Sequence, residues 1–351
     1  MRDCDRWFFA AACAPNFNES WGRERLASDP STPSVSALST EGMKFAYFLP
    51  APAPVPAPVP VVHRGKDNSP HSELSLQMRH IILHHHIFKN AGSSLDSSLA
   101  AQFGQAFTHF EMDGNPIDER ALVAFLDRQP LLEVVSSHNF MGGPIESILR
   151  SHGYRAFHLA MVRRPFQRLL SIYKYFRRTH TGHDLSRLAA QLDIQSYGRL
   201  LIERYPHMVD NPQVNILAND GFYGHAVCED DLSRAWDRYS KYSLCAPVER
   251  YDESMVVLEY FNAPVYAPNG LNLAYVRQNV SEPIFGEENV KETLGEATFD
   301  WLRRLHEFDE RLWSFANAEL NRRICRVPEF DQRLASFKVR CQRLMAQAER
   351  I

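Results

Sequence analysis

Residues 79–99 read RHIILHHHIFKNAGSSLDSSL, and this stretch decides how the rest of the chain is interpreted. Its first half is a short, apolar and partly β-branched run of the kind that forms a buried strand. A turn at Gly92 ends that run, after which Leu95, Leu99 and Phe103 recur at helical spacing. The sequence therefore predicts a strand, a loop and a helix in direct succession.

The loop before this helix has the features of an anion site. A helix that begins after a strand presents unpaired backbone N–H groups and the positive end of its dipole. Gly92 allows close approach of the backbone, and Ser93 and Ser94 add hydroxyl donors. Lys89 supplies a full charge, although it precedes the glycine, so the loop is not the Walker A pattern G-x-x-x-x-G-K-[ST]. The alternative is an ordinary helix start beside a solvated lysine.

The alternation of strands and helices continues downstream. Apolar runs at 131–138 (LLEVVSSH) and 156–162 (AFHLAMV) predict two more strands. An amphipathic helix is expected at 117–128, and another from Pro165 to about Arg178. This rhythm is typical of an α/β fold with a central parallel sheet flanked by helices. Ligands in such sheets bind beyond the carboxyl ends of the strands.

The N-terminal and C-terminal parts of the chain differ in composition and periodicity. Residues 1–78 lack periodicity and contain a proline run at 50–60, so we expect a disordered, proline-rich extension there. Residues 79–351 are expected to form a single domain. Its C-terminal part is expected to be helical, and apolar residues in register at 298–323 predict a helix that covers the sheet.

A second candidate element follows the third strand. Arg163 stands at the strand end, where a guanidinium can bind phosphate oxygens through two hydrogen bonds. One face of the predicted helix carries Arg164, Arg168, Ser171 and Tyr175. The alternative is a basic, solvated helix face with ion pairs.

The third candidate is a histidine at the exit of the second strand. His138 lies in SSHNFMGG (136–143), and a neutral imidazole can take a proton from a hydroxyl near pH 7. A structural role is the expectation for most of the 15 histidines. His84, His85 and His86 cannot all ligate one ion, because adjacent strand side chains point to opposite faces.

Composition restricts the partners. The net charge of −3 argues against a nucleic-acid partner, which would need a basic face, so an anion must be held by a local site. No run reaches the ~18 apolar residues of a membrane span, so no integral membrane segment is expected. The six cysteines show no CxxC pairing, as is typical of a reducing compartment.

Together, the three motifs resemble the cofactor-binding pattern of carbohydrate-type sulfotransferases, the family that includes heparan sulfate 2-O-sulfotransferases. HIFKNAGSSL (86–95) resembles the family's 5′-phosphosulfate loop, commonly H-I-P-K-[TN]-[AG]-G-[TS]-[ST]-L. VRRPFQRLLSIYKYF (162–176) resembles its 3′-phosphate element, commonly R-[DN]-P-x-x-R-x-x-S-x-Y. SSHNFMG (136–142) resembles the segment with the proposed base, and weaker similarities extend the match over roughly residues 79–320.

The resemblance implies a P-loop-like nucleotide-binding fold, with 3′-phosphoadenosine 5′-phosphosulfate as cosubstrate. Lys89 would contact the phosphosulfate, and Arg163 and Ser171 would hold the 3′-phosphate. His138 would deprotonate an acceptor hydroxyl, expected to be that of a saccharide, for in-line displacement at sulfur. No metal is expected, because the leaving group is already a stable phosphate anion. The remaining loop positions implied in cofactor binding are Asn90, Ala91, Gly92, Ser93 and Ser94.

The chain departs from the family pattern in two places, and other functions stay open. Phe88 replaces the usual proline and Arg164 the usual acidic residue. Glu249 is a second candidate base, although PVERYDES has the character of a structural helix start. A kinase-like phosphotransferase or a non-catalytic nucleotide-binding protein are the alternatives. A soluble, cytoplasmic protein of bacterial type is expected, since a Golgi enzyme of this kind would be expected to carry a transmembrane helix.

Overall fold

The fold is taken from a computed structural model of the chain, and its described residues belong to one compact unit. The structure describes residues 78–112, 115–179, 184–221, 225–263, 265–266, 270–276 and 287–349. The proline-rich extension expected over residues 1–78 therefore lies, except for residue 78, outside the described residues.

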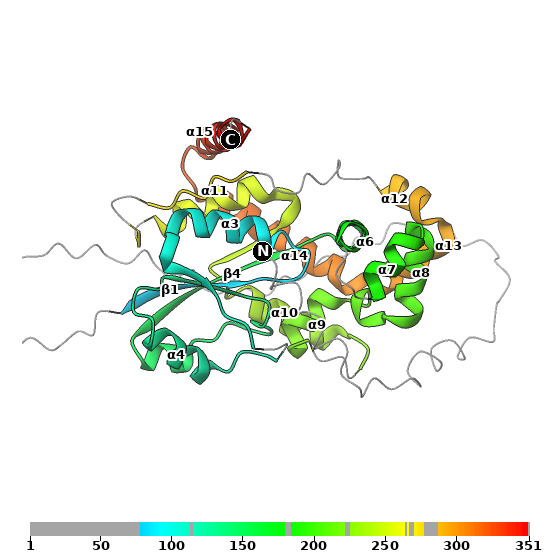
Figure 1. Cartoon of the computed structure of the whole chain (residues 1–351), viewed down its shortest axis with the longest axis horizontal. Coiled ribbons are helices and arrows are strands. Elements are labelled where there is room, and N and C mark those ends of the chain that lie inside the picture. The colour runs from blue at the N-terminus through cyan, green and yellow to red at the C-terminus, as the bar shows by residue number, and fades with distance from the viewer. Residues whose placement is uncertain are drawn as a thin grey trace, which may run out of the picture. The chain divides into compact units, whose positions relative to one another are not determined.

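A five-stranded parallel sheet forms the centre of the described domain, in the order β2-β3-β1-β4-β5 (Figure 1). The strands are β1 (Arg79–His85), β2 (Phe107–His109), β3 (Val134–Ser137), β4 (Tyr154–Val162) and β5 (Leu244–Pro247). The three strands predicted from apolar runs are confirmed as the three central ones, β1, β3 and β4. The edge strands β2 (FTH) and β5 (LCAP), of three and four residues, were not predicted.

Side chains of β1 alternate between two hydrophobic layers. Ile82 packs with Leu95 of the helix that follows β1, whereas Ile81 and Leu83 pack with Leu122 on the opposite face. The helices α3 and α4, which supply these partners, lie on opposite sides of the sheet (Figure 1). The expected α/β architecture, with a parallel sheet flanked by helices, is therefore confirmed.

Most helices pack against the sheet, and a second group forms a helical region beside it. The first group comprises α3 (Gly92–Phe103), α4 (Glu119–Asp127), α5 (Ser147–Ser151), α9 (Pro212–Asn219), α10 (Glu229–Tyr239), α11 (Tyr251–Asn262), α14 (Glu307–Ile324) and α15 (Phe330–Ala348). The second comprises α6 (Pro165–Arg178), α7 (Asp184–Gln191), α8 (Ile194–Arg204), α12 (Glu287–Leu294) and α13 (Glu296–Leu305). Three short 3₁₀ turns join these elements: η1 (Gly104–Ala106), η2 (Pro206–Met208) and η3 (Val248–Arg250).

The helix expected over 298–323 is two helices that meet at His306. The second, α14, covers the sheet as expected and contacts β4 and β5. The first, α13, instead contributes Phe299 and Leu302 to the core of the helical region. Apolar spacing stays in register across the break, so the sequence pattern alone did not reveal it.

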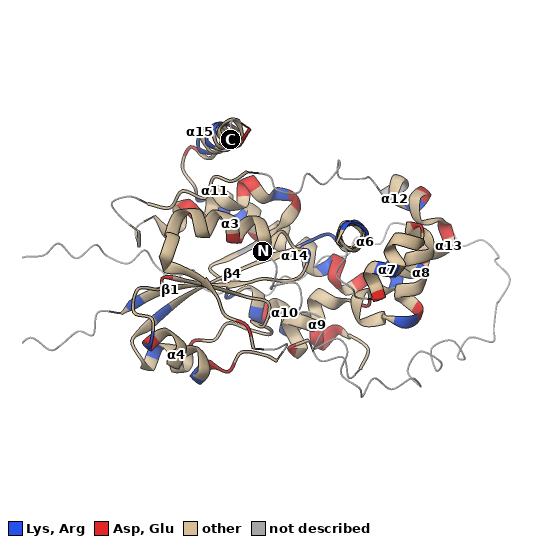
Figure 2. Cartoon of the chain, viewed as in Figure 1, with Lys and Arg blue, Asp and Glu red and all other residues tan. Residues whose placement is uncertain are grey.

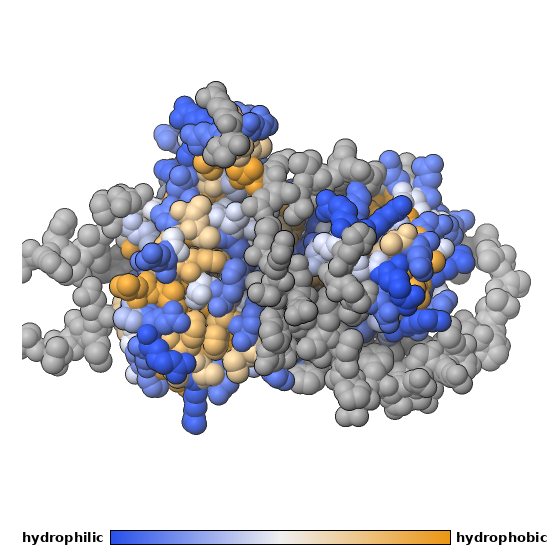
Figure 3. All heavy atoms as spheres, viewed as in Figure 1, coloured by the Kyte–Doolittle hydropathy of each residue, from blue (hydrophilic) through white to orange (hydrophobic). Residues whose placement is uncertain are grey.

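None of the helices in the described ranges combines the length and apolar character needed to cross a membrane. Hydrophilic side chains cover most of the visible surface of the last helix, α15 (Figure 3). Its buried side, with Phe337 and Cys341, belongs to the same core as β1 and α11. Cys228, Cys325 and Cys341 are free thiols.

Candidate functional site

The three candidate elements meet at one edge of the sheet. Strands β3, β1 and β4 are parallel neighbours, so their carboxyl ends lie side by side. Lys89 follows β1, His138 follows β3 and Arg163 follows β4. The edge thus carries two cations and an imidazole from segments that are distant in sequence.

The loop between β1 and α3 has a constrained backbone. Lys89 and Ala91 adopt the left-handed region, with φ of 64° and 61°. α3 begins at Gly92, and no side-chain hydrogen bond caps its start. The first-turn N–H groups of a helix lack carbonyl partners within the helix and can bind an anion. Ser93 is exposed and Ser94 half-buried at this same turn.

Helix α6 holds the loop from the other side. Arg168 is only 3% exposed, and its Nε donates to the Phe88 carbonyl at 3.2 Å. Burial lowers the pKa of Arg168 to about 10. The Lys89 ammonium lies over the Tyr175 ring, 4.2 Å from its centroid. Ser171 lies between Arg168 and Tyr175 on this helix, at the i+3 and i−4 spacings that share a face.

The alternative of a basic, solvated face on α6 is therefore wrong for Arg168, although two exposed basic residues, Arg177 and Arg178, lie in the last turn of this basic helix (Figure 2). Phe88, which stands where the family has proline, packs into the core of the helical region. Its ring meets Tyr175 edge-on, with centroids 5.6 Å apart. An aromatic anchor thus fixes the loop at this position.

Asn90, a predicted cofactor-binding residue, makes several hydrogen bonds within the protein. Its side chain is 1% exposed and donates to the Met161 carbonyl at 2.9 Å and to Gln213 Oε1 at 2.7 Å. Its backbone N–H is also used, by the Ile87 carbonyl at 3.1 Å. Asn90 thus joins the loop to β4 and α9, and it positions the residues beside it.

Arg163 is tied to the same loop. Its Nη1 donates to the Lys89 carbonyl at 3.1 Å, and its backbone N–H donates to Gln213 Oε1 at 2.8 Å. Burial lowers the pKa of Arg163, while the nearby Glu249 carboxylate opposes this shift. Gln213, which was not among the predicted residues, therefore connects Asn90 with Arg163.

Glu249 and Arg164 are engaged in structural contacts. Glu249 accepts the Arg164 backbone N–H at 3.0 Å and the Trp313 indole N–H at 2.8 Å, so it stabilises the start of α6. The Arg164 guanidinium lies over the Trp313 ring at 5.3 Å and 3.6 Å from Glu310. These contacts favour the structural interpretation of Glu249 over a role as base.

A partly buried carboxylate orients the candidate base. His138 Nδ1 lies 3.1 Å from Glu111 Oε1, and Glu111 also accepts the His138 backbone N–H and the Ser137 hydroxyl. Burial opposes ionisation of Glu111, but the contacts with His138 outweigh it and lower the pKa of the carboxyl. Because Nδ1 faces Glu111, a role of His138 as base would fall to Nε2. Glu111 was missed because it follows the unpredicted strand β2.

The candidate base stacks on a histidine that packs against the start of α3. His138 stacks on His86 with ring centroids 4.0 Å apart. A Cβ on Gly92 would lie 2.0 Å from His86 Cδ2, so only glycine allows this close approach. The imidazole of His86 therefore lies between His138 and the first turn of the helix.

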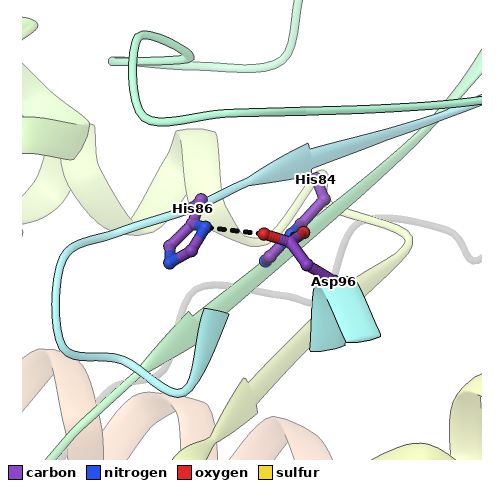
Figure 4. A group of neighbouring side chains, drawn as sticks. All are labelled: His84, His86 and Asp96. Carbon is purple, nitrogen blue, oxygen red and sulfur yellow. Dashed lines mark hydrogen bonds and ion pairs between the residues drawn. The ribbon is translucent and has the colours of Figure 1, made fainter. Parts of the chain in front are cut away.

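Three imidazoles contact Asp96 next to this stack, and Figure 4 shows two of them, those of His84 and His86. Asp96 Oδ1 lies 2.6 Å from His84 Nδ1, and Oδ2 lies 2.8 Å from His86 Nδ1 and 3.1 Å from His109 Nε2. Burial opposes ionisation of Asp96, but His84 and His86 hold its pKa well below the usual value. Burial lowers the pKa of His86 to about 4, so this imidazole is neutral at pH 7. In the described part of the chain, His84, His86 and Asp96 are arranged so that they could hold a metal ion.

The prediction that the three consecutive histidines cannot share one ion holds, but it overlooked that alternate ones converge. His85 points to the opposite face, where it contacts His158, Tyr242 and the Phe140 carbonyl. His84 and His86 meet on the face toward α3.

Comparisons with known proteins assign no family to the chain. No family model matches the chain. An uncharacterized protein of Archaeoglobus fulgidus is 29% identical over 248 residues, which cover 67% of this chain and 95% of that protein.

Proposed function

We propose that the protein is a sulfotransferase with a P-loop-like nucleotide-binding fold. It would move the sulfuryl group of 3′-phosphoadenosine 5′-phosphosulfate to a hydroxyl of an acceptor, which we expect to be a saccharide. One observation carries the proposal: Lys89, Arg163 and His138 share one sheet edge beside the uncapped start of α3. Two anion-binding elements and a base are the parts that this transfer needs.

The anionic nucleotide would bind between the loop and α6. The first-turn N–H groups of α3, the Ser93 and Ser94 hydroxyls and Lys89 would hold the 5′-phosphosulfate. Arg163 and Ser171 would hold the 3′-phosphate, as in the family that the motifs resemble. The hydrogen bond from Arg163 to the Lys89 carbonyl supports this division, because it fixes the two cations relative to each other.

The reaction would be an in-line displacement at sulfur. His138 Nε2 takes the proton of the acceptor hydroxyl as the new O–S bond forms. The bond between sulfur and the bridging phosphate oxygen breaks, and 3′-phosphoadenosine 5′-phosphate leaves. Lys89 would stabilise the charge that develops on that oxygen. Glu111 would stabilise the imidazolium that forms and keep the ring in place.

Calorimetric titration of 3′-phosphoadenosine 5′-phosphate into the full chain tests the nucleotide part of this proposal. We expect binding to the wild type, weaker binding to Lys89→Ala, and unchanged binding to Lys241→Ala, an exposed lysine that precedes β5. ATP with Mg²⁺ serves as the control ligand. Preference for ATP with Mg²⁺ would favour the kinase-like alternative, and no binding of either nucleotide would contradict the proposal.

A further inference from the structure

The histidine cluster beside the candidate base takes no direct part in the proposed transfer. It consists of His84, His86, His109 and Asp96, and three of its members come from the two elements that join at the loop. His84 and His86 are two residues apart at the end of β1, so both side chains leave the same face. Asp96 projects from the second turn of α3 toward that face (Figure 4).

We propose that His84, His86 and Asp96 bind one divalent transition-metal ion, for which zinc is the best match. One potential ligand atom from each of these residues lies within 4.8 Å of the other two. Two imidazole nitrogens and one carboxylate, bound through one or both of its oxygens, form a three-residue ligand set that zinc commonly adopts. Magnesium and calcium prefer oxygen ligands alone, so the donor types favour a softer ion.

The distances allow an ion to enter with small side-chain shifts. Metal bonds of ~2.0–2.1 Å in a tetrahedron separate neighbouring ligand atoms by ~3.3 Å. His84 Nδ1 and His86 Nδ1 lie 2.6 and 2.8 Å from the two Asp96 oxygens. Each pair therefore has to separate by roughly 0.5–0.7 Å, which side-chain rotation can supply.

The surroundings suit a nearly closed site with one open side. The His84 side chain is 1% exposed and that of Asp96 9%. His109 is 36% exposed and lies 3.1 Å from Asp96, so it offers both an approach from solvent and a third imidazole that could serve as the fourth ligand.

The ion would serve to position the neighbouring base. A metal that holds His86 also fixes the ring on which His138 stacks. It would not contact the transferred group, and its binding stands independently of the nucleotide. The sequence-based expectation of no metal concerned the chemistry at sulfur, in which the ion proposed here takes no part.

Zinc titration of the chelator-stripped full chain, in competition with a chromogenic zinc indicator, tests the proposal. We expect one equivalent to bind, with affinity reduced by at least ~100-fold in Asp96→Asn and in His86→Gln, more than loss of an outer partner costs. His152→Gln, an exposed histidine on the turn after α5, is the matched control and should bind as the wild type. Equal zinc binding by wild type, Asp96→Asn and His86→Gln would overturn the proposal.

A measurement on the wild type alone covers the case in which these variants fail to fold. Cobalt(II) added to the stripped protein should give the strong visible absorption of a four-coordinate site, with an end point at one equivalent. Zinc should then displace this signal. A six-coordinate, weakly absorbing spectrum without an end point would mean that the cluster is a hydrogen-bonded network around Asp96 and would overturn the proposal.

Discussion

The two ends of the candidate site are built in different ways. At the nucleotide end, Lys89 and Arg163 are positioned through backbone carbonyls and a buried amide network that includes Asn90. At the base end, His138 is positioned by ionisable side chains, Glu111 on one side and His86 on the other. Because different strands carry the two ends, we expect nucleotide binding and chemistry to be separable by mutation.

The largest effect is expected for His138→Ala. Loss of a general base should reduce the rate of sulfuryl transfer by ~10²–10⁴-fold, with the affinity for 3′-phosphoadenosine 5′-phosphate unchanged. Initial rates with a saccharide acceptor and calorimetry on the same protein measure both. His152→Ala, an exposed histidine, is the control. If the nucleotide affinity falls together with the rate, the two ends are not separable.

Lys89→Ala should act on both measurements, because this residue lies where the transferred group meets the nucleotide. We expect the transfer rate to fall by ~10²–10³-fold, which is typical for loss of one electrostatic stabiliser of a transition state. Initial-rate kinetics at saturating cosubstrate would measure this effect, with Lys241→Ala as control. A variant that lost affinity but kept the full rate would restrict Lys89 to binding.

Glu111→Gln tests whether Glu111 assists His138 in the reaction. Loss of one charge-assisted hydrogen bond of about 1.5–3 kcal/mol corresponds to roughly 10–100-fold in rate. The effect should appear in kcat and leave the dissociation constant of 3′-phosphoadenosine 5′-phosphate unchanged. Glu146→Gln, an exposed carboxylate at the start of α5, provides the comparison. An unchanged kcat would mean that Glu111 only supports the fold.

Buried histidines away from both ends should make stability fall on acidification. Burial lowers the pKa of His158 to about 4 and that of His306 to about 3. Each depressed pKa favours the folded state above pH 6.5, and this stabilisation is lost as the pH falls toward the folded-state value. Between pH 6.5 and 5, each group should cost about 2 kcal/mol of unfolding free energy.

Urea unfolding at several pH values measures this loss. His306→Gln should reduce the slope of stability against pH, whatever its effect at pH 7, because the substituted side chain does not titrate. A slope equal to that of the wild type would contradict the assignment to His306. Nucleotide affinity at pH 7 should remain unchanged in this variant, which separates the core histidines from the site.

The sequence predicted the centre of the fold and missed its edges. Strands β1, β3 and β4 were predictable because each contains a continuous apolar run. Strands β2 and β5 are short, and their place in the sheet depends on pairing with distant segments. The break at His306 leaves the apolar register intact, so it carried no signal either.

The same division holds for the candidate site. Lys89, His138 and Arg163 were identified because they follow predicted strands directly. Their positioning partners are distant in sequence: Glu111 lies 27 residues before His138, and Gln213 lies 50 after Arg163. Only folding brings such pairs together, and contacts between residues so far apart cannot be predicted from a single sequence. The meeting of His84 and His86 could have been found from strand alternation, but Asp96 required the docked helix.

One thermodynamic cycle tests the central claim most directly. The dissociation constants of 3′-phosphoadenosine 5′-phosphate and adenosine 5′-phosphate would be measured for the wild type and for Arg163→Ala. Damage to the loop affects both ligands, so the cycle isolates the contact with the 3′-phosphate. We predict that the wild type prefers the 3′-phosphorylated ligand by ~10–100-fold and that Arg163→Ala loses this preference. Equal affinities in the wild type, or a preference that survives in Arg163→Ala, would contradict the account.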